Sequence, residues 1–229
     1  MQKKVPNRAL PAPIPREEEI DLLRELEIGI AKNIKKRNKQ REKIKILNEL
    51  CVEVFEKYGL EVGYAGPYGI LSENKKYVTN PIVPSYGKGH KNISIYEGVI
   101  GHSFTTWSST YAPSILDLEA QDPNSHSECR TIKEGEEKKD MSEIVIIKKR
   151  KYPEIGTESS KKEFVVQECY DLDIKRPNVF SEEGASDLER LIAPTLDLIF
   201  PGPLLFTPER GTHLRALPNG CEKHMLART

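Results

Sequence analysis

Cys129 is the sharpest candidate for a reactive group in this sequence, because of the residues beside it. It lies three positions after His126 and directly before Arg130, in a polar stretch. Positively charged neighbours favour the thiolate, which is the nucleophilic form of cysteine. His126 and Cys129 would also supply two metal ligands, but a zinc site needs two more, and the sequence does not fix them. We therefore predict no metal site.

Carboxylates form the second chemically suggestive set. In a strand predicted over residues 164–174, Glu168 interrupts an otherwise apolar row, whereas Asp171 and Asp173 share the other face. Glu168 would either add a charge to a ligand pocket or lie at an exposed edge, and we expect the exposed edge. Glu143 lies in the apolar run at 142–147, which is typical of a central strand. With Cys129 as the nucleophile, a carboxylate such as Glu143 or Asp171 would carry the protons.

A polar stretch at 104–111 combines the only tryptophan of the chain with other aromatic and hydroxyl side chains. Such a mixture can close over a small molecule and also donate hydrogen bonds to it. The alternative is structural, with Phe104 and Trp107 filling the core and the hydroxyls capping helix ends.

Helices are predicted at both ends of the domain that must position these groups. Residues 1–15 contain four prolines and predict an extended or disordered lead. Apolar residues at helical spacing over 16–58 predict one long helix, or two helices joined at the basic run 35–43, with Gly59 as the C-cap. Ser181, followed by two glutamates, predicts the N-cap of a second helix that ends near Phe200. We assign no role to the tail, 201–229.

Alternating and continuous apolar runs predict strands at 61–71, 76–83, 114–118, 142–147 and 164–174. Between the second and third, a glycine turn at 98–101 leads into a short helix at 102–107 and a polar turn at 108–110. The helix at 16–58 needs a partner for its apolar stripe. We expect its second half to pack on the helix at 181–200, whereas its first half either packs likewise or forms a homodimer.

The order of these motifs resembles a GAF domain over about residues 60–200. The resemblance rests on D-L-D at 171–173, F-S-E-E at 180–183 and L-E-R-L at 188–191, and upstream on S-E-I-V-I at 142–146 and G-V-I-G at 98–101. It implies an α+β sandwich with a central antiparallel sheet of about five or six strands. The terminal helices would cover one face of the sheet, and a short helix with loops would cover the other and form the lid of a ligand pocket.

The resemblance also implies which residues would form the pocket wall. With Glu168 added from the strand pattern, the candidate ligand-binding residues are Tyr96, Phe104, Thr105, Trp107, Ser108, Tyr111 and Glu168. Some proteins of this fold reduce free methionine sulfoxide, with a cysteine in the loop that Cys129 would occupy. Such enzymes carry a second cysteine in the glycine turn, where this chain has Ile100.

Composition argues against several partners. Lysines and arginines balance aspartates and glutamates, 35 against 35, so no net field favours nucleic acid or a membrane surface. The basic run at 35–43 lacks interleaved aromatic residues and is read as a solvated helix face. No run of about 18 apolar residues predicts a membrane span. Four scattered cysteines without a C-x-x-C pair predict a reduced, cytoplasmic protein.

From the sequence we therefore expect a sensory or regulatory GAF-like module. It would bind an unidentified small molecule and signal through its terminal helices, as a homodimer, to a separate partner. The alternatives are a thiol-dependent reductase that uses Cys129, and a scaffold that binds no ligand. No cofactor can be named.

Overall fold

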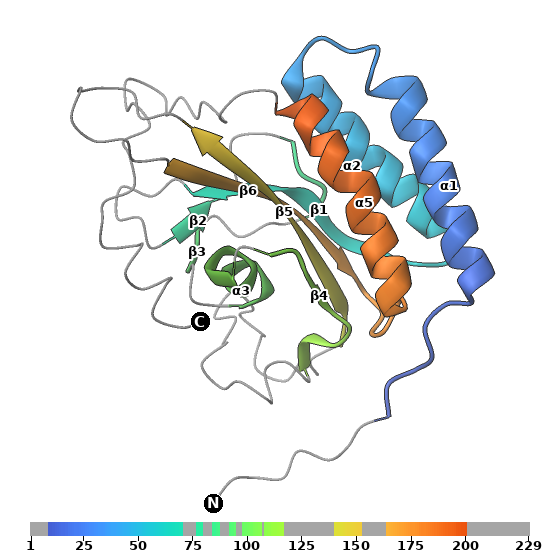
Figure 1. Cartoon of the computed structure of the whole chain (residues 1–229). Helices are drawn as coiled ribbons and strands as arrows, with labels where there is room; N and C mark the ends of the chain where they lie inside the picture. Colours follow the sequence, from blue (N-terminus) through green and yellow to red (C-terminus); the bar gives the residue numbers. More distant parts are fainter. Residues whose placement is uncertain are drawn as a thin grey trace, which may run out of the picture.

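A six-stranded antiparallel sheet separates three long helices from one short helix in the computed structural model of the chain (Figure 1). The structure describes residues 9–70, 77–79, 84–87, 92–94, 98–106, 108–116, 140–152 and 164–200. Within them, the helices are α1 (Arg16–Asn33), α2 (Gln40–Lys57), α3 (Gly98–Thr106) and α5 (Glu182–Ile199). The strands are β1 (Val62–Ile70), β2 (Tyr77–Thr79), β3 (Asn92–Ser94), β4 (Thr110–Ala112), β5 (Ser142–Tyr152) and β6 (Phe164–Ile174).

The sheet has the order β3-β2-β1-β6-β5-β4, so the two longest strands, β5 and β6, lie side by side at its centre. They pair in an unbroken register from Ser142 opposite Ile174 to Tyr152 opposite Phe164. Because side chains alternate along a strand, this register sends the even-numbered residues of both strands to one face and the odd-numbered residues to the other. The two faces therefore carry different chemistry.

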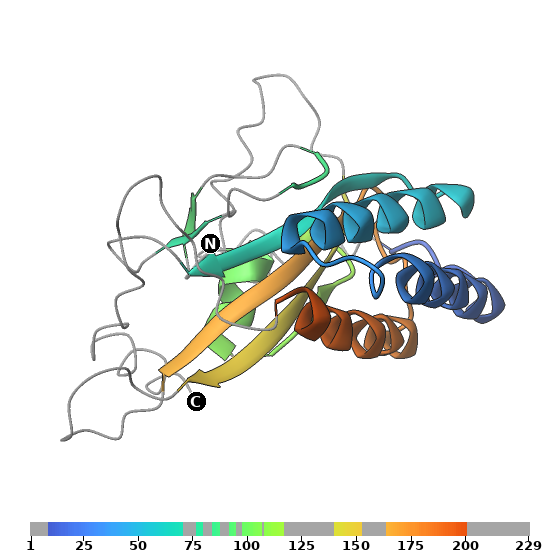
Figure 2. The same cartoon turned by 90° about the horizontal axis from the view of Figure 1, so that it is seen from above.

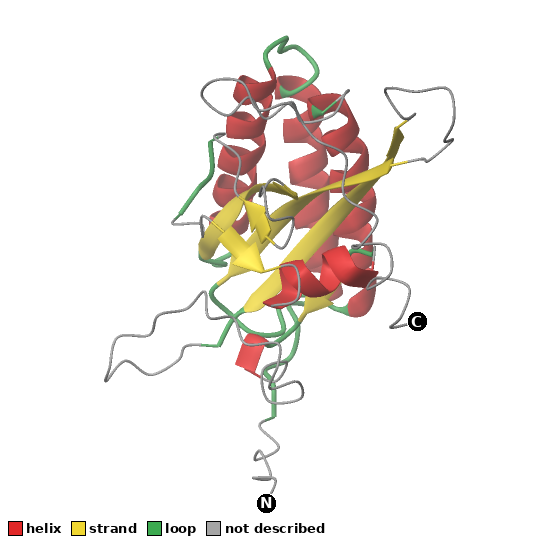
Figure 3. Ribbon diagram, turned by 90° about the vertical axis from the view of Figure 1, so that its left-hand side faces the viewer, coloured by secondary structure: helices red, strands yellow, loops and turns green. Residues whose placement is uncertain are grey.

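Helices cover the even face in two layers (Figure 2). Helix α2 packs on β1 and α5 packs on β5, whereas α1 lies outside them and contacts both. Among the described elements, helix α3 covers the odd face (Figures 1 and 3). The chain thus builds four layers, and the even face bears the larger apolar core.

The apolar stripe of α1 is buried inside the chain. Leu22, Leu26, Ile30 and Ile34 are each at most 5% exposed, because α2 and α5 cover them. The basic run at 35–43 contains the joint between two helices, as one of our two alternatives expected. A homodimer remains a prediction, and it would need a surface other than this stripe.

The N-terminus of α5 is held by a carboxylate from α1. Glu19 is fully buried and accepts hydrogen bonds from the backbone N–H of Ser181 (2.6 Å) and from its hydroxyl (2.9 Å). Ser181 in turn caps the helix by accepting from the N–H of Gly184 (3.0 Å). Arg16 bonds to Glu19 and Asp187, so the buried charge has a cationic partner.

Gly184 leaves the room that this carboxylate needs. A Cβ atom at position 184 would lie 2.5–2.6 Å from the carboxyl group of Glu19. A larger residue at position 184 would therefore force the carboxyl group of Glu19 out of its present position.

The C-terminus of α5 is held by a lysine from the sheet. Lys148 of β5 is 7% exposed, donates to the carbonyl oxygen of Phe200 (3.3 Å) and forms an ion pair with Asp197. Lys43 of α2 donates to the carbonyl oxygen of Leu198 (2.9 Å). Cations are favoured where helix carbonyls lack partners, so α5 is fixed electrostatically at both ends.

Several elements match the sequence expectations. Gly59 follows α2 with a positive φ of 72°, Ser181 caps α5, and the strands expected at 142–147 and 164–174 lie in the sheet as β5 and β6. Strand β5 runs on to Tyr152, past its expected end at residue 147. The described residues contribute six strands to the sheet. Among the helices of the described residues, none is long and apolar enough to cross a membrane.

Two predicted elements are wrong. The strand expected at 114–118 is instead β4 at 110–112, and Ile115 and Leu116 are helical. Pro113 follows β4, and the carboxylate of Asp140 then accepts from the hydroxyl of Ser114 (2.9 Å) and the N–H of Leu116 (3.3 Å), which turns the chain. The glycine turn expected at 98–101 is the first turn of α3, which begins at Gly98 with φ +66°.

Replacing Glu19 with glutamine should lower the free energy of unfolding by about 2 kcal/mol, because charge-assisted hydrogen bonds to a buried carboxylate are lost. Urea unfolding followed by circular dichroism measures the change. The matched control is Glu18→Gln, one residue away and exposed, which should cost less than about 1 kcal/mol. Equal losses of unfolding free energy in the two variants would show that the contact between Glu19 and α5 adds no stability of its own.

Candidate ligand-binding site

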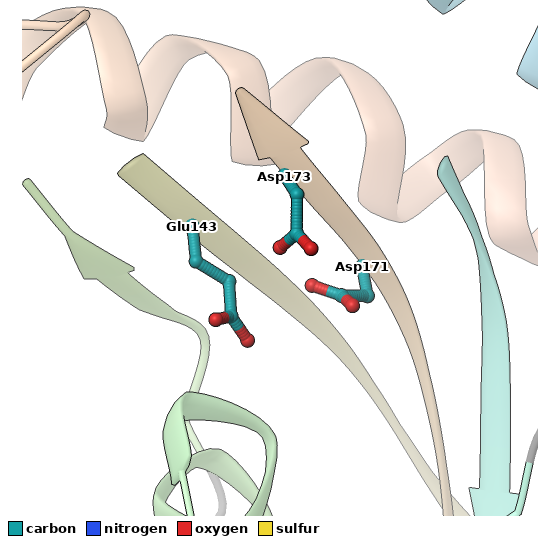
Figure 4. A group of neighbouring side chains, drawn as sticks. All are labelled: Glu143, Asp171 and Asp173. Carbon is teal, nitrogen blue, oxygen red and sulfur yellow. The ribbon is translucent and has the colours of Figure 1, made fainter. Parts of the chain in front are cut away.

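Three carboxylates converge on the odd face of the sheet. Glu143 comes from β5 and Asp171 and Asp173 from β6, and Glu143 lies directly opposite Asp173 in the register. One oxygen atom from each of the three lies within 4.8 Å of the others. Figure 4 shows the three groups turned toward one another from the two strands.

This cluster lies at the edge of the apolar core beneath α3. Asp171 is 3% exposed, whereas Glu143 and Asp173 are half-buried. Val145 and Cys169 lie on the same strand face and pack with Val99, Ile100 and Phe104 of α3. Negative charges at the margin of an apolar layer attract a positive charge or hydrogen-bond donors more strongly than charges in open water do.

Tyr64 of β1, opposite Asp173 in the register, lies on this face beside the cluster. Burial raises the pKa of Tyr64, and the negative charge of Asp171 raises it further, although a hydrogen bond with Tyr68 acts the other way. The phenol therefore stays protonated at neutral pH, and its hydroxyl already takes part in hydrogen bonds with Tyr68 and Ser85. Three carboxylates suit a ligand that carries an ammonium group or several polar hydrogens.

The described cysteines are unsuited to attack a substrate. Burial raises the pKa of Cys169 well above its usual value, and the charge of Asp171 adds to this effect. Burial raises the pKa of Cys51 to about 12, although the hydroxyl of Tyr170, 3.6 Å from its sulfur, partly offsets the shift. Both residues remain thiols at neutral pH. Cys129 and His126 lie outside the described residues.

Those of the predicted pocket residues that the structure describes lie on different faces of the sheet. Phe104 is fully buried on the odd face under α3, and Ser108 is exposed just after that helix. Tyr111 and Glu168 lie on the even face instead. Tyr96, Trp107 and the side chain of Thr105 lie outside the described part of the chain, so their role stays a prediction.

Tyr111 is held in place by Phe180. Its hydroxyl donates to the carbonyl oxygen of Phe180 (3.1 Å) and accepts from the N–H of the same residue (3.0 Å). The two rings also meet edge to face, with centroids 6.5 Å apart. Tyr111 therefore fastens β4 to the residue before the N-cap of α5, and its ring borders a groove described below.

Glu168 does not lie at an exposed edge, and that expectation is wrong. Glu168 is 1% exposed and lies opposite Lys148 in the register of the two central strands. The even-face helices cover this end of the sheet, and α5 ends at Lys148. Glu168 thus belongs to a buried charged region at the C-terminus of α5, on the other face from the three carboxylates.

Asp173 is the residue of the cluster that the sequence reasoning missed, because it was not placed among the candidate site residues. The signal was present in the alternation, because Glu143, Asp171 and Asp173 all have odd numbers and so lie on one face of the two central strands. What was missing was the register that sets Glu143 against Asp173. Carboxylate oxygens are also ligands of hard cations, and the expectation of no metal site stays a prediction.

Comparison with known proteins identifies the fold. No family model and no curated protein matches the sequence. Among solved structures, a GAF domain matches with 20% identity and a TM-score of 0.51, over 79% of this chain and 86% of that one. The free methionine-R-sulfoxide reductase of Neisseria meningitidis, in complex with its substrate, matches with 16% identity and a TM-score of 0.51, over 84% and 95%. The chain therefore has a GAF-like fold.

Cys51 and Cys169 should resist alkylation in the folded protein, because each is a buried thiol with a raised pKa. Iodoacetamide at pH 8, followed by peptide mass spectrometry, measures their labelling. Both should react once urea unfolds the chain, which is the control. Rapid labelling of either residue in the native protein would contradict the burial described here.

Proposed function

We propose that this GAF-like domain is a regulatory module that binds a small molecule between the sheet and α3. The observation that carries the proposal is the convergence of Glu143, Asp171 and Asp173 on the face that α3 covers. Grouped acids repel one another, and keeping them together costs stability. A ligand with a positive charge or several donors would reduce that repulsion. The energy gained in this way would add to the free energy of binding.

The proposed output runs through the helices. Strand β6 carries Asp171 on the odd face and Tyr170 on the even face, where the hydroxyl of Tyr170 donates to Asn48 of α2 (2.8 Å). A shift of β6 on ligand binding would therefore act directly on α2. In a homodimer, the exposed residues Ile20 and Ile28 of α1, 40% and 45% exposed, would supply the apolar contact. A separate partner protein would receive the signal.

The ligand can be sought by thermal shift with a panel of amino acids, polyamines, nitrate and cyclic nucleotides. A ligand at a hundred times its dissociation constant adds about 2.7 kcal/mol of stability. We expect a compound with an ammonium group to raise the melting temperature, and Asp171→Asn to abolish the rise. Asp21→Asn, on the exposed surface of α1, is the control and should respond like the native chain. A rise that survives in Asp171→Asn would place the ligand elsewhere.

A second candidate function is reduction of free methionine sulfoxide. It is favoured by the structural likeness to the Neisseria reductase together with the carboxylate cluster. The thiolate of Cys129 would attack the sulfoxide sulfur, and Glu143 or Asp171 would protonate the sulfoxide oxygen. That oxygen would then move to the sulfur of Cys129 as its bond to the substrate sulfur and the transient sulfur–sulfur bond break. The products would be the thioether and a sulfenic acid on Cys129, which two equivalents of an external thiol would reduce to the thiol, with release of water and a disulfide.

The native chain, given free methionine sulfoxide and dithiothreitol, should then form methionine, and Cys129→Ser should lose the activity. Chromatography of the amino acid product measures the rate. Cys221→Ser is the control for a general thiol effect and should keep full activity. If the native chain forms no methionine, this second candidate fails and the regulatory proposal stands.

A further inference from the structure

A groove of about 510 Å³ opens on the even face, away from the carboxylate cluster. It runs between α5 and β4, because β4 is the outermost strand and α5 packs over its neighbour β5. Its volume lies in the range of small-molecule sites.

The floor of the groove is apolar and rigid. Ile144 and Ile146 of β5 form its base, and Tyr111 and Phe180 close one end. The paired hydrogen bonds hold the ring of Tyr111 against the backbone of Phe180, and the two rings meet edge to face. Such a floor offers a preformed surface for an aromatic or aliphatic body, so binding would cost little ordering of the protein.

The rim of the groove carries two acids of α5 that form no ion pair, whereas other acids of α5 do. Glu183, Asp187 and Asp197 each have an ion pair, to Arg16, Arg190 or Lys148. Glu182 and Glu189 line the groove, and within the described part of the chain they have no such partner.

The lining also contains no cationic side chain. Besides the two glutamates, the polar members of the lining are hydroxyls and one amide: Ser109, Thr110, Asn178, Ser181 and Ser186. The groove is therefore a concave apolar surface under two carboxylates whose charge nothing in the lining neutralises.

We propose that this groove is a second binding site, specific for a small organic cation with an apolar body. The body would lie on the floor, against the rings of Tyr111 and Phe180. The ammonium group would lie between Glu182 and Glu189, which are seven residues apart and hence two turns along one side of α5. Rim hydroxyls would accept its remaining hydrogens.

Three indoles of one size and different charge test the proposal: tryptamine, tryptophol and indole-3-acetate. Isothermal titration of the full chain at low salt measures binding. Tryptamine should bind at least ten times more tightly than tryptophol, and indole-3-acetate should not bind. Equal binding of tryptamine and tryptophol, or no binding of tryptamine, overturns the proposal.

Variants locate the site. The double variant Glu182→Gln/Glu189→Gln should weaken tryptamine binding at least tenfold, and Ser186→Leu, which fills the groove from the exposed side of α5, should do the same. The control Glu183→Gln changes a neighbouring carboxylate that Arg16 already pairs, and it should leave binding unchanged. Asp21→Asn, on the exposed surface of α1, should also leave binding unchanged.

Loss of tryptamine binding in Asp171→Asn alone would assign the cation to the carboxylate cluster and overturn the second site. A tryptamine response that disappears on dilution together with a dimer, seen by light scattering, would assign the groove to a second copy of the chain and overturn it as well.

Discussion

The position of α5 depends on two charges that other elements bring to its ends. Glu19 of α1 meets the unpaired N–H groups at its start, and Lys148 of β5 meets the carbonyl groups at its end. Each charge is buried, and each is neutralised by a partner, Arg16 or Asp197. The helix that closes the core is thus fixed in translation as well as in orientation. The groove beside α5 owes its constant shape to this arrangement.

The alternation of the two central strands separates the two acidic sites. Odd positions carry Glu143, Asp171 and Asp173 toward α3, whereas even positions such as Ile144, Ile146 and Leu172 carry apolar side chains toward α2 and α5. A shift of one residue in β6 would move Asp171 and Asp173 into the larger core, where burying two carboxylates would be costly. The same register therefore protects the fold and presents the candidate site.

Much of the architecture could be predicted from local patterns. Ser181, Gly59 and the alternating residues of 164–174 each specify a local structure, and the structure has it.

The candidate site was harder to predict, because its residues meet through pairing of distant segments. Glu19 reads as an ordinary residue of a charged helix until Ser181, 162 positions later, is placed against it. Likewise, Glu168 reads as an edge residue because a charge in an apolar row is usually exposed, and its burial opposite Lys148 follows only from the register. A strand of three residues such as β4 is too short to show a pattern.

The outer layer formed by α1 has a practical consequence for where this fold begins. A shortened chain that started at Gln40 would retain every strand of the described sheet. A domain boundary chosen from the sheet and the helices next to it would therefore leave α1 out. It would nevertheless leave the first turn of α5 without its carboxylate, and it would uncover the side of α2 and α5 on which Leu22, Leu26 and Ile30 rest. Because such a fragment would expose a large apolar surface to water, we expect it to aggregate. The cooperative unit reaches back at least to Ile14, whose N–H donates to Val179 just before α5 begins.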